Sequence, residues 1–447
     1  MKLNIFKPSV TLTSRGRLSL ILFILSILPV AFLVCDPAAA ENVTIQQVVL
    51  STDTVPMGGT TFGDLRAPSI NAHGAIAFND GFGSAIYTTA RGSEVGRLIR
   101  AVGAGDVPPG ILGSFGGIAE PSLNDDGSFA FRGFGLDSSN RGIYLFLAPG
   151  ELKLVADAST VRPGTHETFS PGGPGVPVAS DGGHILFHHG TASTEGVYRA
   201  GFNPITKRVS LAELVVLEDG FVGLPGFEFP LGYSVNDLGL AAMVLQRPDF
   251  TRGIYLASPN HLLRPIVEEG DSAPGGGSFT SNLGAPSINA TNKVAFFGDF
   301  GSGFGIFVAN PGNLIRKVVD TSTEVPNHPG TLFNGFGSIN IADDAHSTII
   351  FQGRYRLNGR DFQGLYKKSS AGIGVIFDQF DGLVVNSQPI SLVYNSPFGN
   401  GGVLNLSLAP RFANVGDSVA SVAFLQELPP AEGDPHRRSG IFVAVQR

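Results

Sequence analysis

The stretch PSINAHGAIAF at residues 68–78 reads as a short strand, a polar turn and an apolar strand that ends in Ala-Phe. Similar stretches recur along the chain, and successive copies lie 53, 56, 56, 53, 55 and 73 residues apart. Five copies are clear and the last two are degenerate. The first turn residues are Asn71, Asn124, Ser180, Asn236, Asn289, Asp344 and Asp417. Recurrence at such a period indicates a repeat architecture.

One further marker follows each copy, and another lies between that marker and the next copy. The first is a Gly-Ile-Tyr-like triplet that ends at Tyr87, Tyr144, Tyr198, Tyr255, Phe307, Tyr366 and Phe442. The second is an apolar run, as at residues 98–102, 152–156, 263–267 and 314–319. Each repeat therefore predicts four short antiparallel strands, which is typical of a propeller blade.

The two ends of the repeat region complement each other. Residues 45–50 match a fourth strand without its preceding three, and the last repeat stops at a third strand, residues 440–445. The N-terminal strand is therefore expected to complete the last blade and hide two sheet edges. We predict an all-β fold, a seven-bladed β-propeller of four-stranded antiparallel blades, and favour it over an array of β-sandwiches.

Composition agrees with a turn-rich β protein. The 447 residues include 60 Gly and 30 Pro, and only 15% are charged. Because both residue types disfavour helix interiors, long helices are not expected.

These repeats resemble a known family. The pattern N-x-x-G-x-x-A-F with its Pro-Ser prefix is similar to the secreted bacterial tandem-repeat proteins that carry this motif, over residues 45–447. The copy at residues 179–187 also resembles the propeller repeat of TolB-like periplasmic proteins. The first resemblance implies export and tandem repeats, without a known activity.

The first 40 residues have the pattern of a cleavable export signal. Four basic residues precede an apolar run at residues 18–34, and Ala38, Ala39 and Ala40 stand before Glu41. We expect a signal peptide at residues 1–40, a propeller domain at residues 41–447 and a secreted or periplasmic protein. A retained membrane anchor or a lipoprotein joined through Cys35 are the alternatives.

Cleavage would change the chemistry of the chain. The only cysteine, Cys35, would leave with the leader, so no disulfide or thiolate site is expected. The remaining 26 basic and 36 acidic residues give a net charge of −10. An acidic surface argues against nucleic acid and anionic membranes as partners. We expect a monomer that binds a protein or glycan.

Function is expected at one end of the sheets, which we call the long-loop face. There the loops between second and third strands and the connections between blades emerge, including residues 103–120, 157–175 and 270–285. Most of these connections repeat an acidic residue followed by Pro. The acidic residues are Asp53, Asp106, Asp157, Asp219, Asp271 and Asp320. They predict a carboxylate ring for a cation, sugar hydroxyls or a basic peptide, or else solvated turns.

Other polar residues are weaker candidates. Arg141 and Arg252, like Arg438, precede the aromatic triplet, and each could hold a ligand carboxylate or pair with the acidic loops. His184, His188 and His189 cluster on one strand, as metal ligands or as exposed polar residues. The turns at residues 124–127 and 236–239 resemble calcium-loop fragments, but four residues supply too few oxygens, so we favour structural turns.

No cofactor is expected, although calcium stays open, and no catalytic motif stands out. We therefore predict a non-enzymatic binding module, with a secreted polysaccharide hydrolase or lyase as the alternative. The seventh repeat contains an insertion at residues 386–411 with Tyr394 and Phe398. It is either a partner contact or a decorated edge.

Overall fold

The computed structural model divides the chain into two units, Met1–Ala40 and Glu41–Arg447. It describes residues 43–446 apart from 57–58, 67, 72, 81–82, 90–96, 111–112, 137–140, 171–172, 191–194, 217–231, 248, 261, 313, 345, 386–387, 391–412, 415–419 and 429–437. The leader therefore lies outside the described residues, and its cleavage stays a prediction. In the described part of the chain, no helix has the length and apolarity needed to span a membrane.

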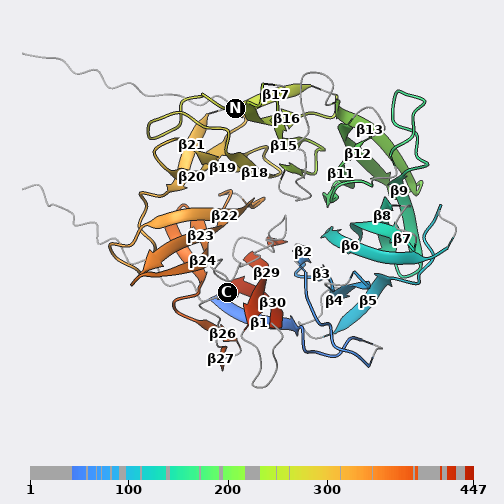
Figure 1. Ribbon diagram of the computed structural model, residues 1–447, viewed down its shortest axis with the longest axis horizontal. Helices are drawn as coiled ribbons and strands as arrows, with labels where there is room; N and C mark the ends of the chain where they lie inside the picture. Colours follow the sequence, from blue (N-terminus) through green and yellow to red (C-terminus); the bar gives the residue numbers. More distant parts are fainter. Residues whose placement is uncertain are drawn as a thin grey trace, which may run out of the picture. The chain divides into compact units, whose positions relative to one another are not determined.

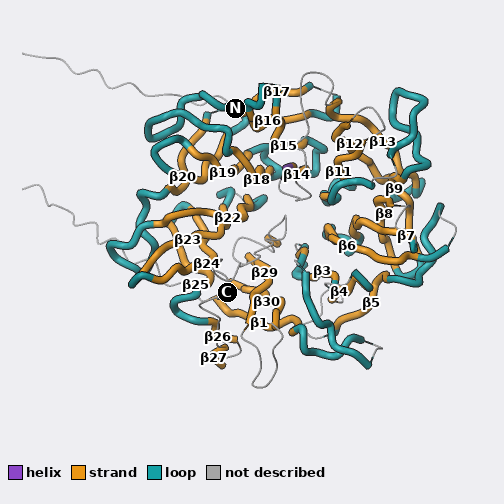
Figure 2. The backbone as a smooth tube through the Cα atoms, in the orientation of Figure 1, coloured by secondary structure: helices purple, strands orange, loops and turns teal. Residues whose placement is uncertain are grey.

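Strands and loops make up nearly all of the described chain (Figure 2). Its strands form seven four-stranded antiparallel sheets and one two-stranded hairpin. Within Glu41–Arg447, Figure 1 shows the sheets following one another about a common axis.

The first three sheets along the chain are β2 to β5, β6 to β9 and β10 to β13. Their strands are β2 Ser69–Ile70, β3 Ile76–Asn79, β4 Ala85–Thr89, β5 Leu98–Gly103, β6 Phe115–Leu123, β7 Phe129–Gly135, β8 Arg141–Ala148, β9 Glu151–Asp157, β10 Val178–Ala179, β11 His184–Gly190, β12 Glu195–Asn203 and β13 Arg208–Val216.

The next three sheets are β14 to β17, β18 to β21 and β22 to β25. Their strands are β14 Tyr233–Val235, β15 Ala241–Gln246, β16 Arg252–Ala257, β17 Leu263–Glu268, β18 Leu283–Ile288, β19 Val294–Asp299, β20 Phe304–Ala309, β21 Ile315–Asp320, β22 Phe333–Ile341, β23 Ile349–Leu357, β24 Arg360–Ser369 and β25 Gly372–Asp378.

The last sheet joins both ends of the described chain, in the order β1-β30-β29-β28. Its strands are β1 Val43–Leu50, β28 Ala413–Asn414, β29 Ala420–Leu428 and β30 Arg438–Gln446, and the separate hairpin is β26 Leu383–Val385 with β27 Gln388–Ile390. β1 pairs antiparallel with β30, from Val43 opposite Gln446 to Leu50 opposite Gly440. Residues 45–50 thus occupy the fourth-strand position expected from the sequence.

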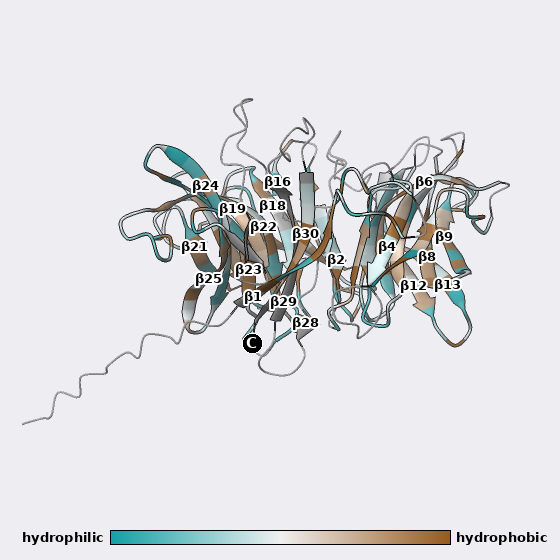
Figure 3. Ribbon diagram, turned by 90° about the horizontal axis from the view of Figure 1, so that it is seen from below, coloured by the Kyte–Doolittle hydropathy of each residue, from teal (hydrophilic) through white to brown (hydrophobic). Residues whose placement is uncertain are grey.

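The fourth strands expected in four repeats are present as β5, β9, β17 and β21. The long connections are shorter than expected, because β6 already begins at Phe115 and β18 at Leu283. Figure 3 shows hydrophobic stretches along strands such as β8 and β12, in keeping with their burial in the sheets.

A trio of aromatic rings fills the core of five sheets. In each trio, a phenylalanine from the preceding connection or from the start of the first strand meets the third-strand ring edge-on, at 4.8–5.0 Å and 79–88°. The second-strand phenylalanine stacks on that same ring at 5.7–5.8 Å and 25–29°. The trios are Phe62/Phe78/Tyr87, Phe115/Phe131/Tyr144, Phe169/Phe187/Tyr198, Phe279/Phe296/Phe307 and Phe333/Phe351/Tyr366. Both geometries are favourable for aromatic pairs, so the ring pattern accounts for two of the repeated aromatic positions.

The glycine of the Gly-Ile-Tyr-like triplet makes room for the ring two residues later. A Cβ on Gly142 would lie 2.9 Å from the Ala156 carbonyl oxygen and 3.1 Å from Cε2 of Tyr144. On Gly364 it would lie 2.6 Å from the Tyr366 hydroxyl. Residues i and i+2 of a strand share one face, so only glycine lets the tyrosine ring lie back along its own strand.

The Ser and Asn residues of the repeat tie neighbouring sheets together. The hydroxyl of Ser69 accepts from the backbone N–H of Leu123 at 3.0 Å, and Ser122 accepts in the same way from Ala179 at 2.8 Å. The amide of Asn236 donates to the carbonyl oxygen of Asn289 at 3.0 Å. The same bonds are made by Ser234, Ser287, Asn71 and Asn289. Buried polar groups need such partners, so the motif fixes how one sheet sits against the next.

The asparagine turns are structural. The side-chain oxygen of Asn236 accepts from the N–H groups of Leu238 and Leu240, both at 3.1 Å, and Gly239 has a φ of 74°. The sixth turn is longer, because β22 ends at Ile341 and Ala342 pairs with Thr348, while Asp344 forms the turn. Asp344 nevertheless plays the turn role expected for it.

Candidate functional site

Three of the expected acidic residues close turns at the long-loop face. The Oδ2 atoms of Asp53, Asp106 and Asp271 each accept a hydrogen bond from the backbone N–H three residues earlier, at 2.7, 2.8 and 2.8 Å. Asp106 also pairs with Arg100 at 3.0 Å. An aspartate that accepts a local backbone N–H is a common turn device.

Asp157 and Asp320 occupy a different place in the same turns. Here Thr160 and Thr323 supply the accepting oxygen, and they receive the N–H groups of Asp157 at 2.9 Å and of Asp320 at 3.1 Å. Within their turns, Asp157 and Asp320 therefore lie three positions before the place that Asp53, Asp106 and Asp271 occupy in theirs. Both side chains are buried. The described carboxylates therefore do not form one equivalent ring.

The environment of Asp320 favours its charged form. Burial raises the pKa of this carboxyl, but hydrogen bonds from Lys317, Ser322 and Thr323 outweigh burial and leave the pKa lowered. The Lys317 ammonium lies 2.6 Å from Oδ2. Asp219 lies outside the described residues. Whether any of these carboxylates holds a ligand stays a prediction, and no group of three or more metal-type side chains occurs in the described residues.

Four of the described connections that follow these turns are small hairpins. Isolated bridges pair Thr54 with Thr61, Val161 with Thr168, Ser272 with Ser278 and Glu324 with Leu332. Each hairpin ends at the phenylalanine that enters an aromatic trio, as at Phe62 and Phe279. The acidic residue followed by Pro therefore marks a connection that packs against its sheet through this phenylalanine.

Arg252 and Arg141 have different surroundings, although both begin a third strand. The Nε of Arg252 donates to the side chain of Gln246 at 3.0 Å. The guanidinium of Arg141 lies 5.4 Å from the ring centre of Phe134, directly across the β7–β8 pair. Arg132 approaches the same ring at 5.3 Å. Two cations thus share one aromatic ring at the long-loop end of this sheet.

Arg132 is the centre of a polar cluster that sequence reasoning missed. Its Nη2 donates to Oε1 of Glu120 at 2.8 Å, and its Nη1 lies 3.5 Å from the carbonyl oxygen of Pro174. Its side chain is 13% exposed, against 34% for Glu120. In the described part of the chain, the buried Nε of Arg132 has no hydrogen-bond partner.

Glu120 has a strained backbone. Its φ is 55°, in the left-handed region that non-glycine residues seldom adopt, and it sits at a bulge in the β6–β7 ladder. A bulge interrupts β18 at the matching place, yet no described residue of β18 has a positive φ. Backbone strain of this kind occurs most often at functional sites, where the surrounding structure maintains it.

Two further sheets reach the same cluster. Tyr233, at the start of β14, donates its hydroxyl to the carbonyl oxygen of Val176. Gly175 donates its N–H to the carbonyl oxygen of His188 on β11 at 2.7 Å. Burial raises the pKa of Tyr233, with Arg132 and Glu120 among its charged neighbours. Residues 174–176 are thus held between three sheets beside Arg132.

The histidines do not act as one group. His189 is 1% exposed and stacks on Phe169 at 4.4 Å, and its Nδ1 accepts the N–H of Gly190 at 2.9 Å. Burial lowers the pKa of His189 to about 4. Burial, reinforced by Arg199, also lowers the pKa of His184. His189 is therefore neutral at ordinary pH and packs as an aromatic side chain.

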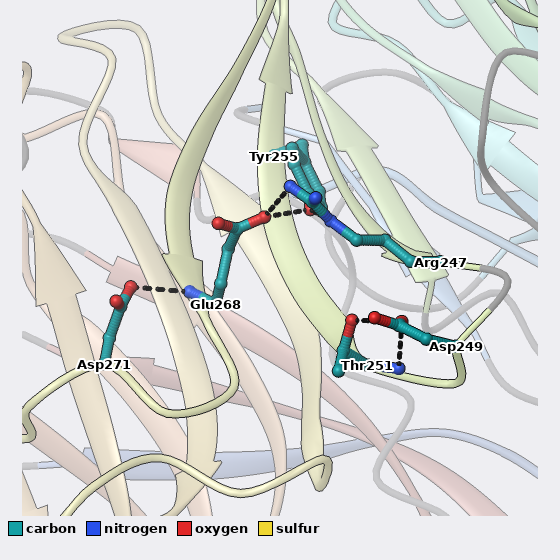
Figure 4. A network of polar contacts seen from close by, with 6 residues as sticks. All are labelled: Arg247, Asp249, Thr251, Tyr255, Glu268 and Asp271. Atoms are coloured by element: carbon teal, nitrogen blue, oxygen red, sulfur yellow. Dashed lines mark hydrogen bonds and ion pairs between the residues drawn. The ribbon is translucent and has the colours of Figure 1, made fainter.

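Figure 4 shows a second polar network, on the outer half of sheet β14 to β17. The Nε of Arg247 donates to the Tyr255 hydroxyl at 3.2 Å, and its guanidinium pairs with Glu268. These bonds tie the loop between β15 and β16 to the outer strand. Phe250 in this loop has a φ of 69° and is exposed.

A third network is buried in sheet β22 to β25. Asp378 accepts hydrogen bonds from Tyr355 at 2.5 Å, Tyr366 at 2.6 Å and the backbone N–H of Phe380 at 2.9 Å. The Nε2 of His328 lies 3.2 Å from the Tyr355 hydroxyl. All four side chains are buried, so this network anchors the connection that carries His328.

One signal could have revealed Arg132 and His188 together. Each directly follows the Phe that ends the repeated motif, where other copies have Asn79, Val244, Phe297, Gln352 and Leu425. This variable position lies on the strand after the shared core residues. The seventh-repeat residues Tyr394, Phe398 and Asp417, by contrast, lie outside the described residues.

The stacked four-stranded sheets define a β-propeller. Residues 132–382 match a family model described as a family of unknown function, DUF7453, and the chain belongs to that family. No curated protein matches the chain.

Solved structures similar to this chain include other propellers. The β-propeller domain of the Trilobed protease from Pyrococcus furiosus is 11% identical, over 82% of this chain and 91% of that one, with a TM-score of 0.43. Virginiamycin B lyase from Staphylococcus aureus is 10% identical over 90% and 99%, with a TM-score of 0.43. Polysaccharide lyase Uly1 is 10% identical over 91% and 99%, with the same TM-score. Because the sequence identities and TM-scores are this low, we derive no function from the similarity to these structures.

Proposed function

We propose that this protein is an exported, non-enzymatic binding module. It is a closed seven-bladed β-propeller in which β1 completes the last blade. The polar cluster of Glu120, Arg132, Phe134, Arg141 and Tyr233, which we call the Arg132 cluster, binds its ligand. The observation that carries the proposal is the pairing of Arg132 with a strained Glu120, held by three sheets at the long-loop face.

Binding is favoured over hydrolysis or lysis for a geometric reason. The described aspartates of the acidic-Pro pattern each accept hydrogen bonds within their own turns, so these five carboxylates are already engaged locally. The His328, Tyr355 and Asp378 network is buried. A catalytic acid and base must reach the substrate, whereas a rigid cluster of donors and acceptors suffices for binding.

Export and the relation to the N-x-x-G-x-x-A-F proteins are parts of the same proposal. They are supported by the basic and apolar leader with its three alanines and by the repeated motif. Expression of the full chain in a bacterial host, followed by N-terminal sequencing of the extracytoplasmic protein, tests export. A first residue of Glu41 would support it, and an intact leader would instead indicate an anchor.

The binding proposal is tested with a glycan and peptide array on which released products are followed by mass spectrometry. We expect retention of at least one ligand class without turnover. Released fragments would overturn the non-enzymatic assignment, and retention that is unchanged by substitution of Arg132 would move the site elsewhere.

A further inference from the structure

We infer that the loop between β15 and β16 is a second interaction surface, which docks a basic segment of a partner protein by stacking the exposed Phe250 ring against an arginine. This loop belongs to the outer half of sheet β14 to β17 (Figure 4). It shares no residue with the Arg132 cluster.

Phe250 combines two unfavourable features. Its φ of 69° lies in the left-handed region, where a bulky side chain is a genuine outlier. Phe250 is also 73% exposed, more than any other phenylalanine in the described ranges. Glycine or asparagine at this turn position would avoid both the backbone strain and the exposed apolar area. Local rules that are broken without a structural gain indicate a functional position.

The loop holds Phe250 in place. Its N–H donates to the carbonyl oxygen of Arg247 at 2.9 Å, and the N–H of Arg247 donates to the carbonyl oxygen of Thr251 at 2.8 Å. Within this turn, Oδ1 of Asp249 accepts from the N–H and the hydroxyl of Thr251 at 3.0 and 2.6 Å. Figure 4 shows the loop tied to the outer strand through Arg247. Because the turn is fixed beforehand, little backbone entropy is lost on docking.

The charge around Phe250 selects a cation. Six charged side chains belong to this loop and to the adjoining ends of β16 and β17. They are the carboxylates of Asp249, Glu268, Glu269 and Asp271 and the guanidinium groups of Arg247 and Arg252. The carboxylates therefore outnumber the cations by two.

Two of these carboxylates are open to a partner. Asp249 and Glu269 are exposed, and in the described chain neither has an ion-pair partner. Hydrogen bonds from Thr251 lower the pKa of Asp249, which keeps this carboxyl charged. A carboxylate thus directly precedes the exposed ring in the same turn.

An arginine suits both the ring and the carboxylates. Its planar guanidinium stacks on aromatic faces and also pairs with carboxylates through a fork of N–H donors. An apolar side chain would cover the ring but leave the excess negative charge, whereas nucleic acid or an anionic membrane would be repelled by it. The surface therefore fits a basic protein segment that carries an arginine.

The test uses fluorescence anisotropy of the purified protein with three labelled peptides. Each contains three cationic or neutral residues separated by glycines, and these residues are arginine, lysine or citrulline. Citrulline keeps the shape of arginine without its charge. We expect the lysine peptide to bind about threefold more weakly than the arginine peptide, and the citrulline peptide about tenfold more weakly. The affinity for arginine should decrease as salt is added.

Variants locate the surface. Phe250→Asn is expected to weaken binding of the arginine peptide about tenfold. It should also raise the melting temperature by about 1–3 °C, because asparagine tolerates the left-handed region. Ile205→Asn is the matched control, since Ile205 is 90% exposed and has no positive φ. We expect this control to leave the affinity within about twofold and the melting temperature unchanged.

Several outcomes would overturn the inference. One is equal binding of the arginine and citrulline peptides, and another is no binding of the arginine peptide at all. Equal effects of Phe250→Asn and Ile205→Asn would show general attraction to an acidic protein. A lower melting temperature for Phe250→Asn would contradict the strain assigned to Phe250. The proposed Arg132 cluster stands or falls separately, because neither variant alters its residues.

Discussion

The side-chain amide of Asn71 donates a hydrogen bond of 2.9 Å to the backbone carbonyl oxygen of Asn124, the residue 53 positions later in the next sheet. Its own Oδ1 accepts from the N–H of Ala75 at 2.9 Å within its turn. One side chain thus closes a hairpin and joins two sheets. The repeated motif therefore holds neighbouring sheets together and also stabilises the turn within each sheet.

Asn236→Ala is expected to lower the free energy of unfolding by about 1–3 kcal/mol, because it leaves buried groups at Asn289 and in its own turn without partners. Urea denaturation measures the change. Asn203→Ala is the control, since Asn203 accepts only local bonds in an exposed turn. An equal effect of both substitutions would show that the contact between sheets adds nothing.

Gly142→Ala is expected to destabilise the protein by about 1–3 kcal/mol, through overpacking against Tyr144 and the Ala156 carbonyl oxygen. Gly284→Ala is the matched control in β18, where a Cβ would meet nothing within 4 Å. Thermal melts of the two variants should differ. A neutral Gly142→Ala would refute the steric role given to the triplet glycine.

Tyr355→Phe is expected to destabilise the protein by about 1–3 kcal/mol, because Asp378 loses a donor in a buried site. Tyr144→Phe should be neutral or stabilising, since the Tyr144 hydroxyl has no hydrogen-bond partner among the described residues. Chemical denaturation compares them. A larger loss for Tyr144→Phe would contradict this account of the buried network.

Stability should decrease on acidification because of His189. Burial lowers its pKa from 6.5 to about 4, so between these values the unfolded chain binds a proton that the folded chain does not. The unfolding free energy is expected to fall through this window by up to about 3 kcal/mol. His189→Gln should reduce the slope measured by urea titrations at several pH values. A slope that His189→Gln leaves unchanged would contradict this role of the buried imidazole.

Calcium is expected to leave the melting temperature unchanged between chelator and millimolar Ca²⁺. Asp53, Asp106 and Asp271 already accept backbone N–H groups, and a calcium site requires six to eight oxygens. A clear rise in the melting temperature would instead indicate a cation site among these loops.

Much of the architecture could be predicted because it depends on local chemistry. The alternation of apolar residues, the turn residues such as Asn71 with Gly74, and the paired markers gave the strands and their order. The partner of the N-terminal strand followed from counting strands, and β1 indeed pairs with β30. Equivalent turns were harder to align, since Asp and Thr oxygens replace each other at one position.

The sequence by itself determined the β class, the repeat and the position of its turns, since hydrophobic period and turn propensity act between residues close in the chain. Only the tertiary structure decided which polar residues meet. Arg132 touches Glu120 from a neighbouring strand and residues 174–176 from the following connection. Their contact depends on a bulge, a strained φ and the stacking of three sheets, and none of these has a local signature in the sequence.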